Sequence, residues 1–269
     1  MGWSNGRELT SLSGNGINAT FTYDASGLRL SKTVGSTTTV YEYVDGKLLY
    51  EKKGDMELHY GYDSEGQPRY IQYVKADGST GSGYMVTNSR GDVVGIVNGN
   101  GVMIVNYEYD AWGNVLSVTD QNGAVITSAG HLGNLNSLRY RGYYYDTDLE
   151  MYYLQSRYYD PEVRRFINAD DVSVLEEDQG SIVEHNMFAY CLNNPVNMLD
   201  ESGTIAVTTC ILIGAGIGAA IGGGVGAYRA SKKYKPKDGW KYWKYVVEYG
   251  VIGGSVGALV GWGGKRPSC

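Results

Sequence analysis

Residues 105–120 read VNYEYDAWGNVLSVTD, and this stretch has the pattern of a β-hairpin. Apolar and polar residues alternate before the turn, and a period of two is typical of a strand with one buried face. Asp110 and Gly113 then supply the turn, because an aspartate side chain accepts hydrogen bonds from the following backbone amides and glycine tolerates a positive φ. The stretch therefore predicts two antiparallel strands with a tyrosine at their corner.

The same Y-D-x-x-G unit occurs at residues 23–27 and 62–66, and residues 88–97 (NSRGDVVGIV) hold a degenerate copy without the tyrosine. One hairpin alone is marginally stable, so the units are expected to pair edge to edge in one long sheet. We predict antiparallel hairpins over residues 17–170, with each Y-D-x-x-G at a turn; the alternative is an ordinary β-sandwich with D-x-x-G turns. So few hairpins cannot close a shell, so an open sheet edge is expected.

Tyrosine is unusually frequent, with 25 residues against three phenylalanines. Eight of them fall in residues 139–171, RYRGYYYDTDLEMYYLQSRYYDPEVRRFINADD. A ring with a polar tip suits a half-buried strand, where the hydroxyl finds a polar partner. The stretch therefore favours a structural role for its tyrosines.

The net charge is −6, and the charged residues are unevenly distributed along the chain. Residues 201–269 hold nine Lys/Arg and three Asp/Glu, whereas the remainder holds 14 basic and 26 acidic residues. Such asymmetry predicts two regions with different surroundings.

No metal site or cofactor is predicted. The three cysteines (Cys191, Cys210 and Cys269) form no C-x-x-C pair, and His185, near Cys191, lacks two further ligands. The sequence also shows no nucleophile–base motif and no phosphate-binding loop, so we predict neither an independent enzyme nor a nucleic-acid partner. The first residues, MGWSNGRELTSLSG, lack the pattern of a signal peptide and begin within a strand pattern, which suggests a piece of a longer protein.

The region after residue 203 changes character. Residues 204–228 carry no charge, and a helix of this length would span about 37 Å, enough to cross a bilayer. Glycine recurs at every fourth position, which would let a second helix approach closely; these candidate packing residues are Gly214, Gly218, Gly222, Gly226, Gly253, Gly257 and Gly261. We expect a helix over 205–228 that meets one over 240–262. Membrane contact through 204–264 and packing inside the protein both stay open.

These motifs together carry a family likeness. The Y-D-x-x-G units, residues 139–171 and NMFAYCLNNPVNMLDESG (186–203) resemble the end of an Rhs (YD-repeat) protein with its Rhs-associated core. The resemblance covers roughly residues 17–203. It implies a secreted or surface-displayed bacterial polymorphic toxin, in which the repeats wind into a hollow β-shell around a C-terminal payload and the core plugs the end of that shell.

The resemblance further implies an aspartyl-type self-cleavage after a D-P-x-G-L-like motif. Its two carboxylates map to Asp170 and Asp200, which would share one proton and activate water. The predicted cut lies between Thr204 and Ile205.

Asp160 and Arg157 would orient that pair. The sequence departs from the family pattern, with Asp171 and Glu201 in place of the prolines and Thr204 in place of leucine. The alternative is that the two carboxylates cap turns.

The predicted fold is thus mainly β, with YD-repeat hairpins in part of an open shell and a short helical glycine-rich hairpin at the C-terminus. Three regions are expected: repeats over 1–136, the core over 137–203 and a variable region over 204–269. The favoured function is a shell or plug segment whose partners are an upstream shell and a toxin payload. A module that binds cell-surface carbohydrate and a membrane-inserting element are the alternatives.

Overall fold

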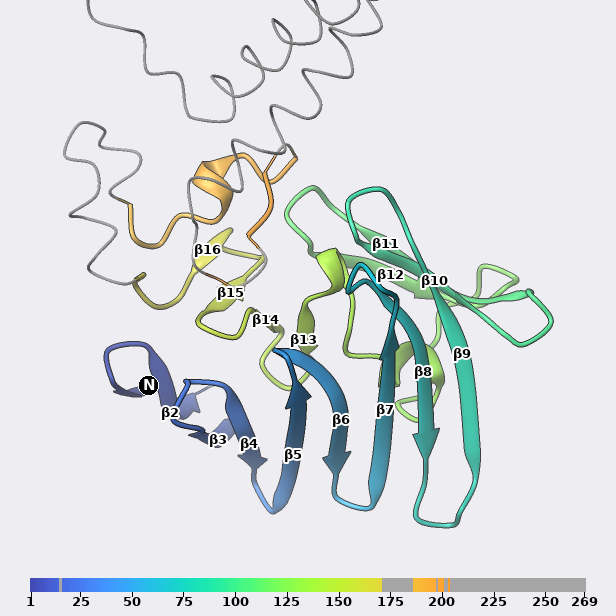
Figure 1. Ribbon diagram of the computed structural model, residues 1–269, viewed down its shortest axis with the longest axis horizontal. Coiled ribbons are helices and arrows are strands. Elements are labelled where there is room, and N and C mark those ends of the chain that lie inside the picture. The colour runs from blue at the N-terminus through green and yellow to red at the C-terminus, as the bar shows by residue number, and fades with distance from the viewer. Residues whose placement is uncertain (15, 171–185, 197, 201–202, 204–269) are drawn as a thin grey trace, which may run out of the picture. The chain divides into compact units, whose positions relative to one another are not determined.

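A computed structural model describes residues 1–14, 16–170, 186–196, 198–200 and 203. The chain divides into two compact units, one of residues 1–189 with 201–203 and the other of residues 190–200 with 204–269. The regular structure of the first unit consists almost entirely of strands (Figure 1).

Twelve strands form one antiparallel sheet in which every strand pairs with its neighbours in sequence (Figure 1). The strands are β1 (Gly2–Ser4), β2 (Glu8–Gly14), β3 (Ile17–Tyr23), β4 (Arg29–Val34), β5 (Thr37–Val44), β6 (Lys47–Lys53), β7 (Met56–Tyr62), β8 (Pro68–Val74), β9 (Thr80–Thr87), β10 (Val93–Val97), β11 (Met103–Tyr109) and β12 (Val115–Thr119). Within the described residues the strand order begins at β1 and ends at β12, so the sheet is open. The predicted hairpins are confirmed.

Each D-x-x-G unit forms a turn that its aspartate caps, as the sequence predicts. Oδ1 of Asp24, Asp63 and Asp110 each accepts hydrogen bonds from the amides two and four residues later, at 2.8–3.0 Å. Asn88 does the same in the degenerate copy, so this unit is also a turn. Strands β1 and β2 lie before the predicted range. They are joined by Asn5-Gly6, whose φ values of 49° and 77° match a tight hairpin turn that the repeat pattern does not reveal.

The tyrosine of each unit joins its hairpin to the strand before it. The hydroxyls of Tyr23, Tyr62 and Tyr109 donate to the carbonyls of Leu9, Leu48 and Val93, at 3.0, 2.8 and 2.8 Å. At all three tyrosines the strand register shifts by a bulge. The same tyrosine-to-carbonyl hydrogen bond, repeated three times, therefore holds neighbouring hairpins together.

A second, four-stranded antiparallel sheet follows a segment that contains the short helix α1 (Leu132–Leu135) and the turn η1 (Tyr140–Gly142). Its strands are β13 (Tyr144–Asp146), β14 (Met151–Tyr153), β15 (Tyr158–Asp160) and β16 (Arg165–Phe166). Two apolar clusters join these elements to the large sheet. Leu132 and Leu138 pack with side chains of β5–β11, and Tyr153 and Tyr158 pack with those of β2 and β3.

Several predictions fall outside the described residues. These include the helical hairpin of 204–269 and its seven glycines. Among the residues that the structure does describe, no helix has the length and apolar character needed to cross a membrane. In the second unit, the turn η2 (Cys191–Asn193) is held by the Cys191 thiol, which donates to the Met198 carbonyl at 3.4 Å.

Gly113→Ala should destabilise the protein more than the matched Gly101→Ala. Both glycines have positive φ values, 92° and 76°, so alanine at either site is strained by about 1–2 kcal/mol. A Cβ at Gly113 would also lie 2.6 Å from Cδ1 of Tyr140, whereas one at Gly101 meets nothing within 4 Å. Overpacking adds about 1–3 kcal/mol at Gly113 alone. Urea unfolding of both variants measures the difference, and equal losses would contradict the contact.

Candidate functional site

The tyrosines of β14 and β15 lie inside the protein, whereas Tyr144 and Tyr145 of β13 are partly buried. Tyr152, Tyr158 and Tyr159 are at most 1% exposed. Their rings contact other tyrosine rings, and the hydroxyls of Tyr152 and Tyr159 donate to the carbonyls of Gly113 and Trp112 at the end of a large-sheet hairpin. These rings are therefore structural, because a buried ring cannot stack on an external sugar.

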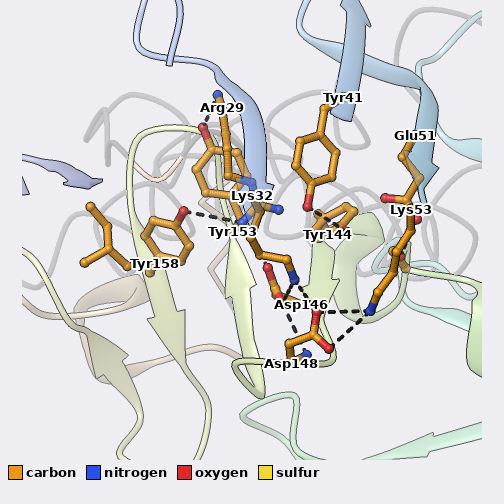
Figure 2. A network of polar contacts seen from close by, with 12 residues as sticks. Arg29, Lys32, Tyr41, Glu51, Lys53, Tyr144, Asp146, Asp148, Tyr153 and Tyr158 are labelled. Atoms are coloured by element: carbon orange, nitrogen blue, oxygen red, sulfur yellow. Dashed lines mark hydrogen bonds and ion pairs between the residues drawn. The ribbon is translucent and has the colours of Figure 1, made fainter. Parts of the chain in front are cut away.

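Arg29 of β4 lies within a cage of tyrosine rings (Figure 2). The guanidinium carbon is 4.5, 5.0, 4.6 and 5.9 Å from the ring centroids of Tyr41, Tyr144, Tyr153 and Tyr158, respectively. Among the described residues, Nε and Nη2 of Arg29 have no hydrogen-bond acceptor. The electron-rich ring faces offset part of this loss, since a cation over a desolvated ring gains about 2 kcal/mol.

Two aspartates on the four-stranded sheet side complete this network, which we call the Arg29–Asp146 network (Figure 2). Asp146 accepts from Arg29 at 2.9 Å and from Lys32 at 2.5 Å. Asp148 accepts from Lys32 at 2.7 Å and from Lys53 at 3.1 Å. The network links β4 and β6 of the large sheet to the β13–β14 turn.

The electrostatics of the network differ between its two aspartates. Asp146 is fully buried, whereas 25% of the Asp148 side chain is exposed. Burial acts to raise the pKa of Asp148, but the hydrogen bonds and charges of Lys32 and Lys53 outweigh it and hold this pKa below its usual value. Asp148 is thus kept ionised between two lysines.

Glu51 of β6 is a buried carboxyl next to the network, 4% exposed. Its Oε1 accepts from the hydroxyls of Tyr60 at 3.3 Å and Ser137 at 3.2 Å, while Oε2 has no hydrogen-bond partner among the described residues. Burial raises the pKa of Glu51, against the opposing influence of the Tyr144 and Ser137 hydroxyls and of two cations. The charged form is therefore disfavoured in the folded protein.

Glu51→Gln should stabilise the protein, and more so at pH 8 than at pH 4. The pKa of Glu51 in the folded protein lies above its ordinary value of 4.5. The wild type therefore loses stability as the pH rises from 4.5 through the folded pKa, whereas Glu51→Gln, which does not titrate, keeps it. Each tenfold difference in proton affinity between folded and unfolded chains is worth about 1.4 kcal/mol. The charged or titratable groups near this carboxyl include Arg29, Lys32, Tyr41, Tyr43, Tyr60, Tyr62 and Tyr144.

Urea unfolding of wild type and variant from pH 4 to pH 8 measures this linkage. A constant difference between the two proteins across that range would contradict it.

Arg157 connects several parts of the predicted cleavage site. Its Nη2 lies 3.0 Å from Oδ2 of Asp170, and both side chains are buried. Its Nε donates to the carbonyl of Gly203, one residue before the predicted cut, and Nη1 donates to the Met187 carbonyl at 3.1 Å. The guanidinium also lies 3.6 Å from the ring centroid of Phe166. Arg157, which is expected to orient the pair of Asp170 and Asp200, thus contacts Asp170.

Asp160 and Asp200 are the other predicted site residues. Oδ1 of Asp160 accepts from the amides of Glu162 and Val163 at 2.9 and 3.2 Å, the arrangement of a turn cap. Asp170 belongs to the first unit, and Asp200, which is 2% exposed, belongs to the second. Their pairing stays a prediction, as does the cut at Thr204–Ile205, which lies outside the described residues.

The repeats and motifs of the sequence do not point to the Arg29–Asp146 network. One signal for it exists, because Arg29 and Lys32 are charged residues in a β-rich run and Asp146 directly follows three tyrosines. Charges at such positions are buried only when they are paired. Their partners, however, lie 117 and 114 residues away in the chain.

Comparisons with known proteins agree with this architecture. No protein-family model matches the chain. It is 33% identical over 189 residues to the tRNA3(Ser)-specific nuclease WapA of Bacillus spizizenii, and the aligned region covers 69% of this chain and 7% of that protein. It is also 27% identical over 150 residues to the toxin protein Tse5 of Pseudomonas aeruginosa, and this aligned region covers 56% of this chain and 10% of that protein.

Among solved structures, TcdB2-TccC3 without its hypervariable C-terminal region matches 75% of this chain and 10% of that chain, with a TM-score of 0.56 and 19% identity. This likeness shows a shared fold. The chain spans a tenth or less of the length of each of these three proteins.

Proposed function

We propose that this chain is the C-terminal part of an Rhs (YD-repeat) protein of the polymorphic-toxin type, in which it forms a segment of the shell wall together with a plug. The similarity to WapA and Tse5, whose names describe a nuclease and a toxin, supports this family, and the shared fold with TcdB2-TccC3 supports a shell. The partners would be an upstream stretch of shell and a toxin payload. The protein would act outside the cell that makes it.

The observation that carries the proposal is the repeated hairpin unit. Each Y-D-x-x-G tyrosine reaches the neighbouring strand in the same way, at Tyr23, Tyr62 and Tyr109. A unit that binds only its neighbours can be repeated without limit, which is what a long wall requires. The β1 edge of the sheet is where an upstream stretch of such a wall would join.

The four-stranded sheet has the features of a plug. It contacts one face of the wall through a tyrosine cluster and through the charged Arg29–Asp146 network. Because ion pairs and hydrogen bonds depend on orientation, this network sets how the four-stranded sheet is oriented on the wall, which apolar burial alone would not do. A buried ion pair contributes specificity of this kind while adding little net stability.

Asp146→Asn should loosen the plug while the wall stays folded. The variant leaves Arg29 and Lys32 without their buried carboxylate, so amides of β13–β16 should exchange with solvent about tenfold faster or more, while those of β5–β11 keep their protection. The matched control is Glu57→Gln, which removes an exposed partner of Lys52. Unchanged exchange in β13–β16, or an equal loss throughout both sheets, would contradict a separately seated plug.

Self-cleavage between Thr204 and Ile205 is the second candidate function. The observation in its favour is that Arg157 contacts both the Asp170 carboxylate and the Gly203 carbonyl. In the proposed reaction one carboxylate removes a proton from water and the protonated one polarises the scissile carbonyl. The products would be a fragment ending at Thr204 and a basic, glycine-rich fragment starting at Ile205.

A further inference from the structure

A cavity of about 720 Å³ lies between the large sheet and the segment that covers it. Inward side chains of β4–β7 form one side, and residues 127–148 form the other. The volume is in the range of small-molecule sites, about 300–1,000 Å³. The lining includes the polar side chains of Lys32, Glu51, Lys53, Ser137, Arg139 and Asp148.

Cations outnumber ionised acids around this cavity. Lys32 and Arg139 are 3% and 4% exposed, and Lys53 reaches the cavity with a side chain that is 46% exposed. Asp148 is the lining carboxylate that faces them and is shared between the two lysines, and Lys32 also pairs with Asp146 outside the lining, so three cations have two carboxylates between them. Excess positive charge in a partly buried site is unfavourable unless an anion offsets it.

The donors of these cations are only partly used. Within the described residues, Lys53 donates hydrogen bonds to Asp148 alone, although an ammonium carries three N–H groups. Arg139 donates from Nε to the Asn136 carbonyl at 3.1 Å, and its guanidinium lies 4.8 Å from the ring centroid of Tyr145.

Glu51 does not cancel this excess. Its carboxyl is buried beside the cavity with one oxygen unpartnered, an environment that favours the neutral acid. Burial raises the pKa of Glu51, in agreement with this geometry. Hydroxyls of Thr37, Thr39 and Ser137 add uncharged hydrogen-bonding groups to the lining.

We propose that this cavity binds a small oxyanion, a phosphate or carboxylate group on a hydroxyl-bearing molecule, with Lys53 as its direct ligand. Lys32 and Arg139 supply the remaining positive charge. The hydroxyls of the lining select a polar molecule over an apolar one. This site lies apart from the predicted cleavage site and shares Lys32, Lys53 and Asp148 with the Arg29–Asp146 network.

Isothermal titration of the full chain with inorganic phosphate, against chloride at equal ionic strength, tests the site. We expect saturable binding that weakens about tenfold or more in Lys53→Met. The matched control is Lys52→Met, because Lys52 is the neighbouring residue, equally exposed, and pairs with Glu57 instead of lining the cavity. Acetate in a parallel titration distinguishes a carboxylate site from a phosphate site.

A pH series adds a second readout. The ratio of the phosphate affinity of Glu51→Gln to that of the wild type should increase as the pH rises through the folded pKa of Glu51, because only the wild type then gains a negative charge beside the cavity. Non-saturable binding, or equal weakening in Lys53→Met and Lys52→Met, would overturn the proposal, since both describe ions at the surface only.

Discussion

Arg29→Met should lower the free energy of unfolding by about 3–5 kcal/mol, the cost of removing one partner from a buried ion pair. The side chain is fully buried, donates to Asp146 at 2.9 Å and lies over four tyrosine rings. Methionine fills similar space but leaves Asp146 with Lys32 alone. Urea unfolding followed by tyrosine fluorescence measures the loss.

Two further variants separate charge from shape. Arg29→Lys keeps the charge but not the planar group that spreads across several rings, so it should fall between wild type and Arg29→Met. Lys52→Met, at an exposed ion pair, should leave the unfolding midpoint nearly unchanged. A loss below about 1 kcal/mol in Arg29→Met would show that the cage does not hold the two sheets together.

Asp170→Asn should abolish self-cleavage and leave the purified chain at its full mass. The side chain is buried against Arg157, so asparagine nearly keeps its shape while removing the carboxylate needed to share a proton with Asp200. Intact-mass spectrometry of the wild type should instead show a fragment ending at Thr204. Asp200→Asn should have the same effect as Asp170→Asn.

The control for cleavage is Asp120→Asn. Asp120 caps an exposed D-x-x-G turn through the amides of Asn122 and Ala124, and asparagine can make the same hydrogen bonds. This variant should be cut as efficiently as the wild type. A wild type that stays at full mass, or an Asp170→Asn chain cut at the wild-type rate, would leave Asp170 with a structural role only.

The sequence by itself determined the repeated parts of this protein. Each turn depends on contacts over four residues or fewer, such as those of Asp110 with the amides of Trp112 and Asn114. Strand alternation is equally local, since neighbouring side chains point to opposite faces. The turn at Asn5-Gly6 was also within reach, because Asn-Gly is a strong hairpin signal even without a tyrosine before it.

The tertiary structure alone decided where the charged side chains meet. Arg29 and Asp146 are 117 residues apart, Ser137 and Glu51 are 86 apart, and Arg157 and Gly203 are 46 apart. No local preference specifies such pairs, because they form only after twelve strands have taken their register and the four-stranded sheet has packed on one face. The sequence marks Arg29, Lys32 and Asp146 as charges within strand-forming runs, and burial then requires each to have a partner, but which partner depends on how the two sheets pack.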